Sequence, residues 1–189
     1  MAEIFKNDFA EAQNILEAFI NTVPNFEKLE KAGIILVNAI KSGNKIISCG
    51  NGGSMCDATH FAEELSGRFR DDRPALPAIA ISDAPHITCT ANDYGFDAIF
   101  SRFVEGMGFE GDVLFAISTS GNSANVIKAA LKAKEKKMKV IALTGKDGGK
   151  LAAIADVEIR APHSKYSDRI QEILIKVIHS LIHYIEENI

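Results

Sequence analysis

The segment Lys45–Ser54, KIISCGNGGS, decides the fold class of this chain. Its first half, Lys45–Cys49, is a short apolar run that predicts a buried strand. Gly50–Gly53 predicts a tight turn, and Ser54–Arg70 has the pattern of a helix. A buried strand that passes through a glycine turn directly into a helix is typical of parallel α/β proteins.

The same order of strand, loop and helix repeats along the rest of the chain. Further strands are predicted at Ala78–Ile81, Val113–Ile117, Lys139–Leu143 and Val157–Ile159. Helices are predicted at His86–Ala91, Asp97–Glu105, Ala124–Lys137 and Asp168–Asn188. Because the strands are continuous apolar runs, we expect a five-stranded parallel sheet covered by helices on both faces. In such sheets ligands bind beyond the C-terminal ends of the strands.

Two helices precede this repeat. Apolar side chains recur at a helical period between Phe5 and Ile20, and Pro24 then breaks the chain. Asn25 is a suitable cap for a second helix that we expect to run to about Ser42. The sequence therefore predicts one domain, with a helical pair over residues 1–42 and an α/β core with a long C-terminal helix over residues 43–189.

Composition narrows the class of protein. The 189 residues are 47% hydrophobic and 24% charged, with 21 basic and 25 acidic residues, as in an ordinary globular domain. We expect no signal peptide, because the first residues, MAEIFKNDFAEAQNIL, carry acids and no small-residue cleavage site after an apolar stretch. We expect no membrane partner, because no run of about 20 apolar residues exists to span a bilayer. The densest basic stretch, Lys132–Lys139, has the pattern of an exposed helix face, so we expect no nucleic-acid partner. Cys49, Cys56 and Cys89 form no CxxC pair, which favours reduced thiols and a cytoplasmic location.

The loop Ser118–Ser123, STSGNS, is rich in hydroxyl groups. Ser118, Thr119, Ser120 and Ser123 supply four hydroxyls between a predicted strand and a predicted helix. Unpaired N–H groups at the start of a helix attract anions, so the loop is suited to a phosphate monoester. The alternative is a simple helix cap, but a cap needs one hydroxyl rather than four.

The loop GNGGS, which follows the first strand, matches neither common phosphate motif. It lacks the lysine of a P-loop, and Met55 stands where a dinucleotide fingerprint needs its third glycine. We expect these glycines to let a small ligand approach the backbone. A plain turn between strand and helix is the alternative.

Polar residues on two predicted helices are candidates for chemistry. His60 and Glu64 lie one turn apart on a single helix face, which suits a metal pair or an acid/base pair, although surface pairs of this kind are common. Gln171, His179 and His183 interrupt the apolar last helix. Gln171 and His179 are separated by ~12 Å of rise and ~80° of rotation in a straight helix. From periodicity alone, His179 has the pattern of a satisfied buried histidine.

Apolar residues on the last helix cover more than one face. They are Ile170, Ile173, Leu174, Ile175, Val177, Ile178, Leu181, Ile182 and Ile185. A helix of this kind is buried nearly all round. Because a domain of this size offers limited cover, we expect part of that surface to contact another subunit.

Taken together, these segments resemble the sugar isomerase (SIS) superfamily and, within it, the phosphoheptose isomerase family. The resemblance rests on CGNGGS, DATHFAEELSGRFR, AIAISD, ANDYGF, ISTSGNSANV, LTGKDGG and DRIQEILIKVIH. It implies a flavodoxin-like three-layer α/β/α fold and a homotetramer. It also implies conversion of sedoheptulose 7-phosphate to D-glycero-D-manno-heptose 7-phosphate, the first step toward the ADP-heptose of lipopolysaccharide.

Carried over residue by residue, the resemblance implies a site. The phosphate falls to Ser118, Thr119, Ser120 and Ser123, and the sugar to Asn51, Gly52, Gly53, Asn92, Asp93 and Gln171. One zinc ion per subunit falls to His60, Glu64, Gln171 and His179. Ser54, Arg68 and Asp168 match positions that line the same pocket. Met55 stands where some members have histidine, which is not a ligand position.

The resemblance also implies an enediol mechanism. Glu64, in contact with the substrate, would be the base and His179 the acid, with zinc near both. A carboxylate held on zinc is a poorer base, so Glu64 either leaves the metal or binds it only in the resting state. The alternative function is a non-catalytic phosphosugar-binding regulator, such as the relatives that bind the replication initiator DnaA. Such a regulator would keep the serine loop without a chemical need for the four metal residues.

Overall fold

A computed structural model describes residues 2–189 and contains one five-stranded parallel sheet. The strands are β1 (Ile46–Cys49), β2 (Ala78–Ala80), β3 (Val113–Ser118), β4 (Lys139–Thr144) and β5 (Val157–Arg160). Their spatial order is β2-β1-β3-β4-β5. This is the flavodoxin-like order, so the predicted fold class is confirmed.

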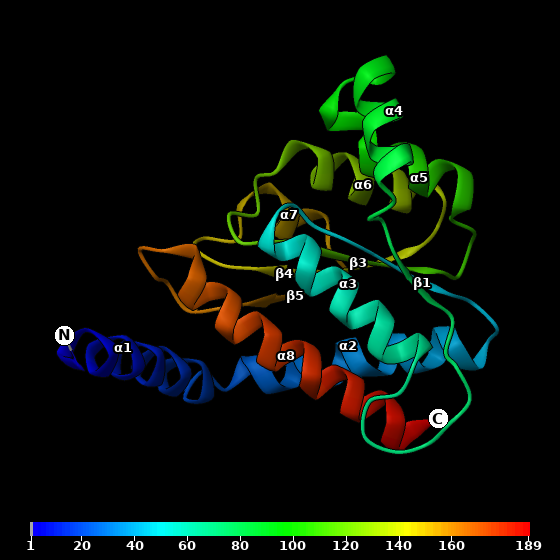
Figure 1. The fold of residues 1–189 in the computed structure, drawn as a ribbon. Helices are drawn as coiled ribbons and strands as arrows, with labels where there is room; N and C mark the ends of the chain where they lie inside the picture. Colours follow the sequence, from blue (N-terminus) through cyan, green and yellow to red (C-terminus); the bar gives the residue numbers. More distant parts are fainter. Residues whose placement is uncertain (1) are drawn as a thin grey trace.

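Helices cover both faces of the sheet and make three layers (Figure 1). One layer holds α1 (Ala2–Ile20), α2 (Pro24–Lys41), α3 (Gly53–Ser66) and α8 (Ser167–Asn188). The other holds α4 (Ala84–Tyr94), a 3₁₀ turn (Phe96–Ala98), α5 (Ile99–Met107), α6 (Ala124–Glu135) and α7 (Gly149–Ile154). Each strand contributes side chains to the packing under both helical layers, because successive side chains point to opposite faces of the sheet. In β3, Phe115 packs in the core under α3 and α8, whereas Leu114 packs in the core under α5 and α6.

The main differences from the sequence prediction concern α3, α2 and α7. Helix α3 ends at Ser66 rather than Arg70, because Gly67 leaves the helical conformation. Asn25 does not cap α2 but lies inside it, where its buried amide donates a 2.9 Å hydrogen bond to the Phe19 carbonyl at the end of α1. Helix α7 was not predicted, because six residues after a glycine pair show no helical period.

One prediction of burial was wrong, and the predicted burial of the last helix was confirmed within the chain. Strand β2 lies at the edge of the sheet, and Ile79 is 42% exposed, so β2 is not covered on both faces. The apolar stripe of α8 is buried within this one chain, except for the partly buried Ile175, and therefore leaves no broad face for another subunit.

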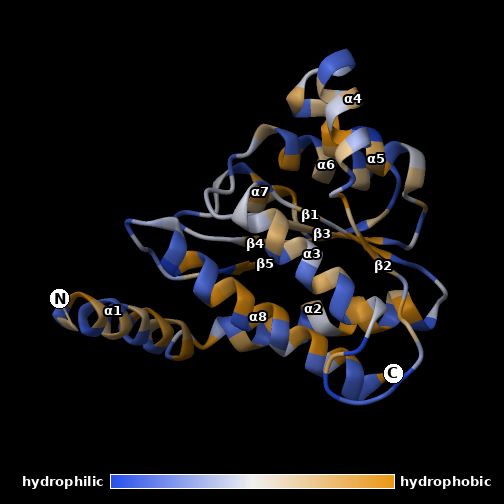
Figure 2. Ribbon diagram, viewed as in Figure 1, coloured by the Kyte–Doolittle hydropathy of each residue, from blue (hydrophilic) through white to orange (hydrophobic). Residues whose placement is uncertain are grey.

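The exposed apolar surface lies instead on α1. Ile4, Phe5 and Phe9 are 64%, 64% and 79% exposed, and Figure 2 shows the apolar residues along this helix. Helix α1 is attached to α8 by the largely buried Arg169, which forms ion pairs with Asp8 (3.2 Å) and Glu11 (3.0 Å). Within residues 2–189, the helices are too short or too polar to cross a membrane.

Candidate active site between helices α3 and α8

The order of the strands creates a crevice between β1 and β3. These neighbours are parallel, but β1 continues into α3 on one face and β3 continues into α6 on the other. Ligands of open α/β sheets bind at this point, beyond the C-terminal strand ends. The glycine loop after β1 and the serine loop after β3 both lie there.

Helices α3 and α8 run side by side in the same direction (Figure 1). Gly53 at the start of α3 lies against Gln171, and His60 two turns later lies against His179. A Cβ on Gly53 would collide with the Gln171 amide, so the amide at the end of that flexible side chain would have to turn away. The separation of eight positions between Gln171 and His179 therefore places them beside different turns of α3.

The centre of the site is a cluster around His60. Its Nε2 lies 3.2 Å from Glu64 Oε1 and 3.3 Å from His179 Nε2. Burial, together with the proximity of His60, lowers the pKa of His179, and this favours its neutral imidazole. Glu63, which the sequence pattern did not single out, offers a carboxylate oxygen within 4.8 Å of the ligand atoms of His60 and Glu64.

These separations fit a shared metal ion. Two donors bound to one tetrahedral zinc at 2.0–2.1 Å are ~3.3 Å apart. His60 holds both Glu64 and His179 at about this distance. Imidazole and carboxylate are also ligands that zinc accepts. Among residues 2–189, the ligand atoms that all lie within 4.8 Å of one another are those of His60, Glu63 and Glu64, so this group suits a divalent metal ion, whereas His179 is close to His60 alone.

The far end of α3 is fixed to α8 by a buried ion pair. Arg73 Nε lies 2.8 Å from Glu186 Oε1, and these side chains are 11% and 6% exposed. The Arg73 guanidinium also donates to the carbonyls of Glu64 (2.7 Å) and Leu65 (2.8 Å), which end α3. This residue was not predicted from the sequence. It joins the turn that carries Glu64 to the helix that carries His179.

A cavity of 370 Å³ lies beside the cluster and contains more of the predicted residues. It is lined by Cys56, Asp57, His60, Asp168, Gln171, Glu172 and Ile175. Among residues 2–189, Asp57 and Glu172 each have a buried carboxylate oxygen without a hydrogen-bond partner. Burial raises the pKa of Asp57, and the nearby His60 opposes that shift. The cavity is therefore lined mainly by polar side chains.

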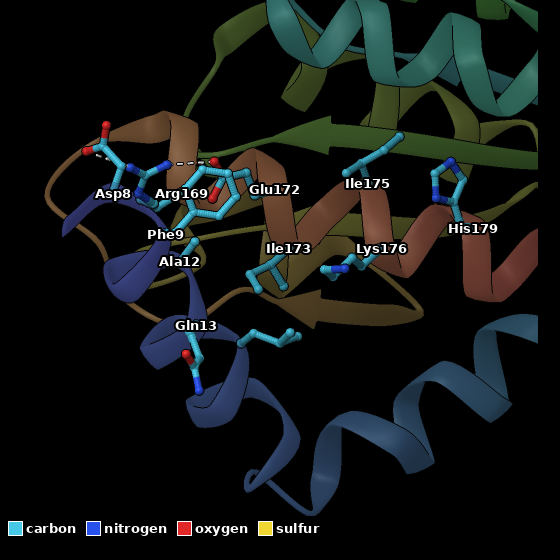
Figure 3. Close-up of a pocket in the computed structure, with 11 residues that line it drawn as sticks. Asp8, Phe9, Ala12, Gln13, Arg169, Glu172, Ile173, Ile175, Lys176 and His179 are labelled. Atoms are coloured by element: carbon cyan, nitrogen blue, oxygen red, sulfur yellow. Dashed lines mark hydrogen bonds and ion pairs between the residues drawn. The ribbon is translucent and has the colours of Figure 1, made fainter. Parts of the chain in front are cut away.

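A larger cavity of 540 Å³ lies between α1 and α8 (Figure 3). His179 is at one end of it and Arg169 at the other. Phe9, Leu16 and Ile173 contribute an apolar lining. An apolar groove between two helices is less suited to a hydroxylated sugar than the polar cavity beside α3.

The serine loop has hydroxyls in position for an anion. Ser118 Oγ and Ser123 Oγ are 3.1 Å apart, and Ser120 Oγ accepts a hydrogen bond from the Asn122 backbone N–H. Within the described chain, Ser123 precedes α6 without a side-chain capping bond, so the simple capping interpretation does not account for it. Gly121 has a φ of +63° and contacts the Gly148 backbone, which explains how the α7 region supports this loop.

The glycine loop contacts the serine-loop region through Asn51. Its side-chain amide forms a reciprocal pair with the amide of Asn125, at 2.9 and 2.8 Å. Ser54 is buried in the first turn of α3, where Gly52 and Gly53 remain exposed. Asn125 was not predicted, because an asparagine near a helix start has an ordinary capping role.

The remaining predicted residues do not join the cluster in this chain. Asn92 and Asp93 are exposed at the C-terminal end of α4, in the layer opposite α3 and α8 (Figure 1). Arg68 is exposed just after α3. Thr119 is partly buried in the serine loop. The sugar-binding role of Asn92 and Asp93 stays a prediction.

This arrangement combines groups that can move protons with groups that can hold an anion. Comparisons with known proteins agree with it. The SIS domain family model matches residues 9–145. A curated phosphoheptose isomerase from Escherichia fergusonii is 60% identical over 98% of this chain and 96% of its own length.

Solved structures extend the likeness to the whole fold. A phosphoheptose isomerase from Neisseria gonorrhoeae has a TM-score of 0.91 at 42% identity. Another from Francisella tularensis has a TM-score of 0.92 at 36% identity, and each comparison covers 98% of both chains. The chain therefore belongs to the SIS domain family and, within it, to the phosphoheptose isomerases.

Proposed function

We propose that this chain converts sedoheptulose 7-phosphate to D-glycero-D-manno-heptose 7-phosphate. The observation that carries the proposal is the cluster of His60, Glu64 and His179, with contacts of 3.2 and 3.3 Å, in the seam between α3 and α8. The cluster lies near the crevice that holds the glycine and serine loops. Identity of 60% to a curated phosphoheptose isomerase supports this substrate over other sugar phosphates.

The two loops would bind the two ends of the substrate. The hydroxyls of Ser118, Thr119, Ser120 and Ser123 would hold the phosphate at the start of α6. Asn51, Gly52, Gly53, Asn92 and Asp93 would contact the sugar. Ser54, Asp168 and Gln171 would line the space between the loops and the His60 cluster.

The reaction moves a proton between C1 and C2 of the sugar. Glu64 would take a proton from C1, and the electrons of that C–H bond would form the C1–C2 double bond. At the same time, His179 would supply a proton to the C2 oxygen. Glu64 would then return its proton to C2, and His179 would remove the proton from the C1 hydroxyl to form the aldehyde. The nitrogen of His179 that gives its proton to the C2 oxygen takes one back from the C1 hydroxyl, so His179 and Glu64 both end the reaction as they began it.

We further propose one zinc ion per subunit, held by His60, Glu64, Gln171 and His179. When bound, zinc would polarise the substrate oxygens and stabilise the negative charge of the enediolate. Gln171 would need to turn its amide from Gly53 toward His60 to act as a ligand. Glu63 is a competing ligand that the geometry adds to the set.

The assembly and location proposed are a homotetramer and the cytoplasm. Ile4, Phe5 and Phe9 leave an apolar face of α1 exposed, and such a face is usually covered in an assembly. We expect light scattering at micromolar concentration to give a mass near four chains. A fully active monomer would contradict this assembly.

The test of the proposed function is turnover followed by product NMR. Purified protein is incubated with sedoheptulose 7-phosphate, beside the Glu64→Gln and His179→Gln variants. We expect the heptose product from the native chain and a loss of about 10²-fold or more in kcat for each variant. A native chain that binds the phosphosugar without turnover would favour the non-catalytic regulator. Chelation should lower activity, and zinc should restore it, with the circular dichroism spectrum unchanged.

A further inference from the structure

The two ligand loops are joined by one pair of side chains. Asn51 Nδ2 donates to Asn125 Oδ1 at 2.9 Å, and Asn125 Nδ2 donates to Asn51 Oδ1 at 2.8 Å. Asn51 lies in the glycine loop after β1, and Asn125 lies in the first turn of α6, two residues beyond the serine loop. The pair therefore bridges the crevice where α3 and α6 leave the sheet on opposite faces.

The hydrogen bonds determine the orientation of both amides. The Val126 backbone N–H donates to Asn125 Oδ1 at 2.9 Å, so this atom is the oxygen. The group that faces it from Asn51 must then be the NH₂, which places Asn51 Oδ1 opposite Asn125 Nδ2. Asn125 is only 2% exposed, so its amide is held in this position by the surrounding core.

The pairing with Asn125 leaves part of the hydrogen-bonding capacity of the Asn51 amide unused. An amide has two N–H donors and an oxygen with two acceptor sites. Asn125 uses one donor and one acceptor of Asn51, so one N–H and one acceptor site remain. Both are held in the plane set by Asn125, at the loop that we propose for the sugar.

We propose that Asn125 is a positioning residue that fixes the glycine loop relative to the phosphate-binding serine loop, so that a phosphosugar held by its phosphate meets a correctly oriented Asn51. This inference rests on the proposed function. Asn125 acts through Asn51 and need not touch the substrate. A displacement of about 1 Å in a reacting group can lower a rate by about 10²-fold, so a modest shift of the loop is sufficient for a large effect.

The test uses a double-mutant cycle with Asn51→Ala and Asn125→Ala in the full chain. We expect each single variant to lower kcat/KM for sedoheptulose 7-phosphate by about tenfold to a hundredfold. We expect the double variant to be no worse than the poorer single variant, because the second change removes a partner already lost. The inhibition constant of inorganic phosphate, which reports on the serine loop alone, should change less than about threefold in Asn125→Ala.

Two further variants separate positioning from stability. Asn125→Asp keeps the volume and the acceptor for the Val126 N–H, but it places a carboxylate oxygen against Asn51 Oδ1 in place of the donated hydrogen bond, so it should turn Asn51 and lower kcat/KM in a folded protein. Asn25→Ala is the control. Like Asn125, Asn25 is a buried asparagine in a helix, and its side chain donates a hydrogen bond to the Phe19 carbonyl. It should lower the melting temperature and leave kcat/KM unchanged.

The outcomes are distinct. Additive losses in the cycle, an active Asn125→Asp, or an equal kinetic loss in Asn25→Ala would each overturn the positioning role. A parallel loss of phosphate affinity in Asn125→Ala would overturn it too, because the pair would then support the serine loop instead. Absence of turnover by the native chain would refute the proposed function, and the positioning role would fall with it.

Discussion

Substituting Glu186 by glutamine should destabilise the fold strongly, because it leaves a buried arginine without its counter-charge. Arg73 and Glu186 are 2.8 Å apart and only 11% and 6% exposed. Removing one partner of a buried ion pair typically costs about 3–5 kcal/mol. The Arg73 guanidinium would still donate to the Glu64 and Leu65 carbonyls, so we expect the lower end, about 3 kcal/mol.

The measurement is the melting temperature at fixed protein concentration. A loss of about 3 kcal/mol in a domain of this length corresponds to a fall of about 6–12 °C. The matched control is Glu110→Gln, because Glu110 pairs with Lys137 at 3.0 Å while the two side chains are 69% and 71% exposed. Exposed pairs contribute little, so the control should melt within about 2 °C of the native protein. Equal melting temperatures for the two variants would refute the buried clamp between α3 and α8.

Three further predictions concern the serine loop, Asp112 and Cys49. Ser120→Ala and Ser123→Ala should each raise KM for the phosphorylated ketose about tenfold or more, because each removes a hydrogen bond to a charged group. An unchanged KM would show that this loop does not bind the phosphate. Although burial opposes it, hydrogen bonds from Lys45 and Phe109 lower the pKa of Asp112. The stability that these hydrogen bonds give is complete above the unfolded pKa of about 3.9 and is lost as the pH falls through the folded pKa. Asp112→Asn should therefore be less stable at pH 7. Its free energy of unfolding, measured in urea, should also fall less steeply between pH 5 and pH 2 than that of the native protein. Burial raises the pKa of Cys49 to about 12, so iodoacetamide at pH 8 should alkylate the exposed Cys56 and leave Cys49 unmodified until the protein unfolds, as peptide mass spectrometry can check.

The strands were predictable because buried strands consist of apolar residues at consecutive positions. A strand covered on both faces is apolar at every position, and β3 and β4 were predicted to within one residue at each end. Strand β2 had the same pattern, AIA, yet it lies at the edge with Ile79 exposed. Pattern alone does not distinguish an edge strand from a central one, because the order of strands depends on contacts between distant segments.

The candidate site was predictable in its parts but not in its geometry. The helical spacing of His60 and Glu64 predicted a shared face, and they are 3.2 Å apart. The contact of His60 with His179 depends on how α3 is aligned with α8, and periodicity within either helix carries no information on that alignment. Arg73 and Asn125 were missed for the same reason, since each acts through a partner more than 70 residues away.

Two contacts along the α3/α8 seam account for the position of the His60–His179 pair. Gly53 at the start of α3 lies against Gln171, and Arg73 joins the end of α3 to Glu186, so the middle turns have little freedom to separate. Between these two points the imidazoles of His60 and His179 are held 3.3 Å apart. Burial lowers the pKa of His179, and repulsion from a charged His60 at that distance would lower it further. The helix packing therefore disfavours protons on both rings and favours a state in which one ion or one proton lies between them.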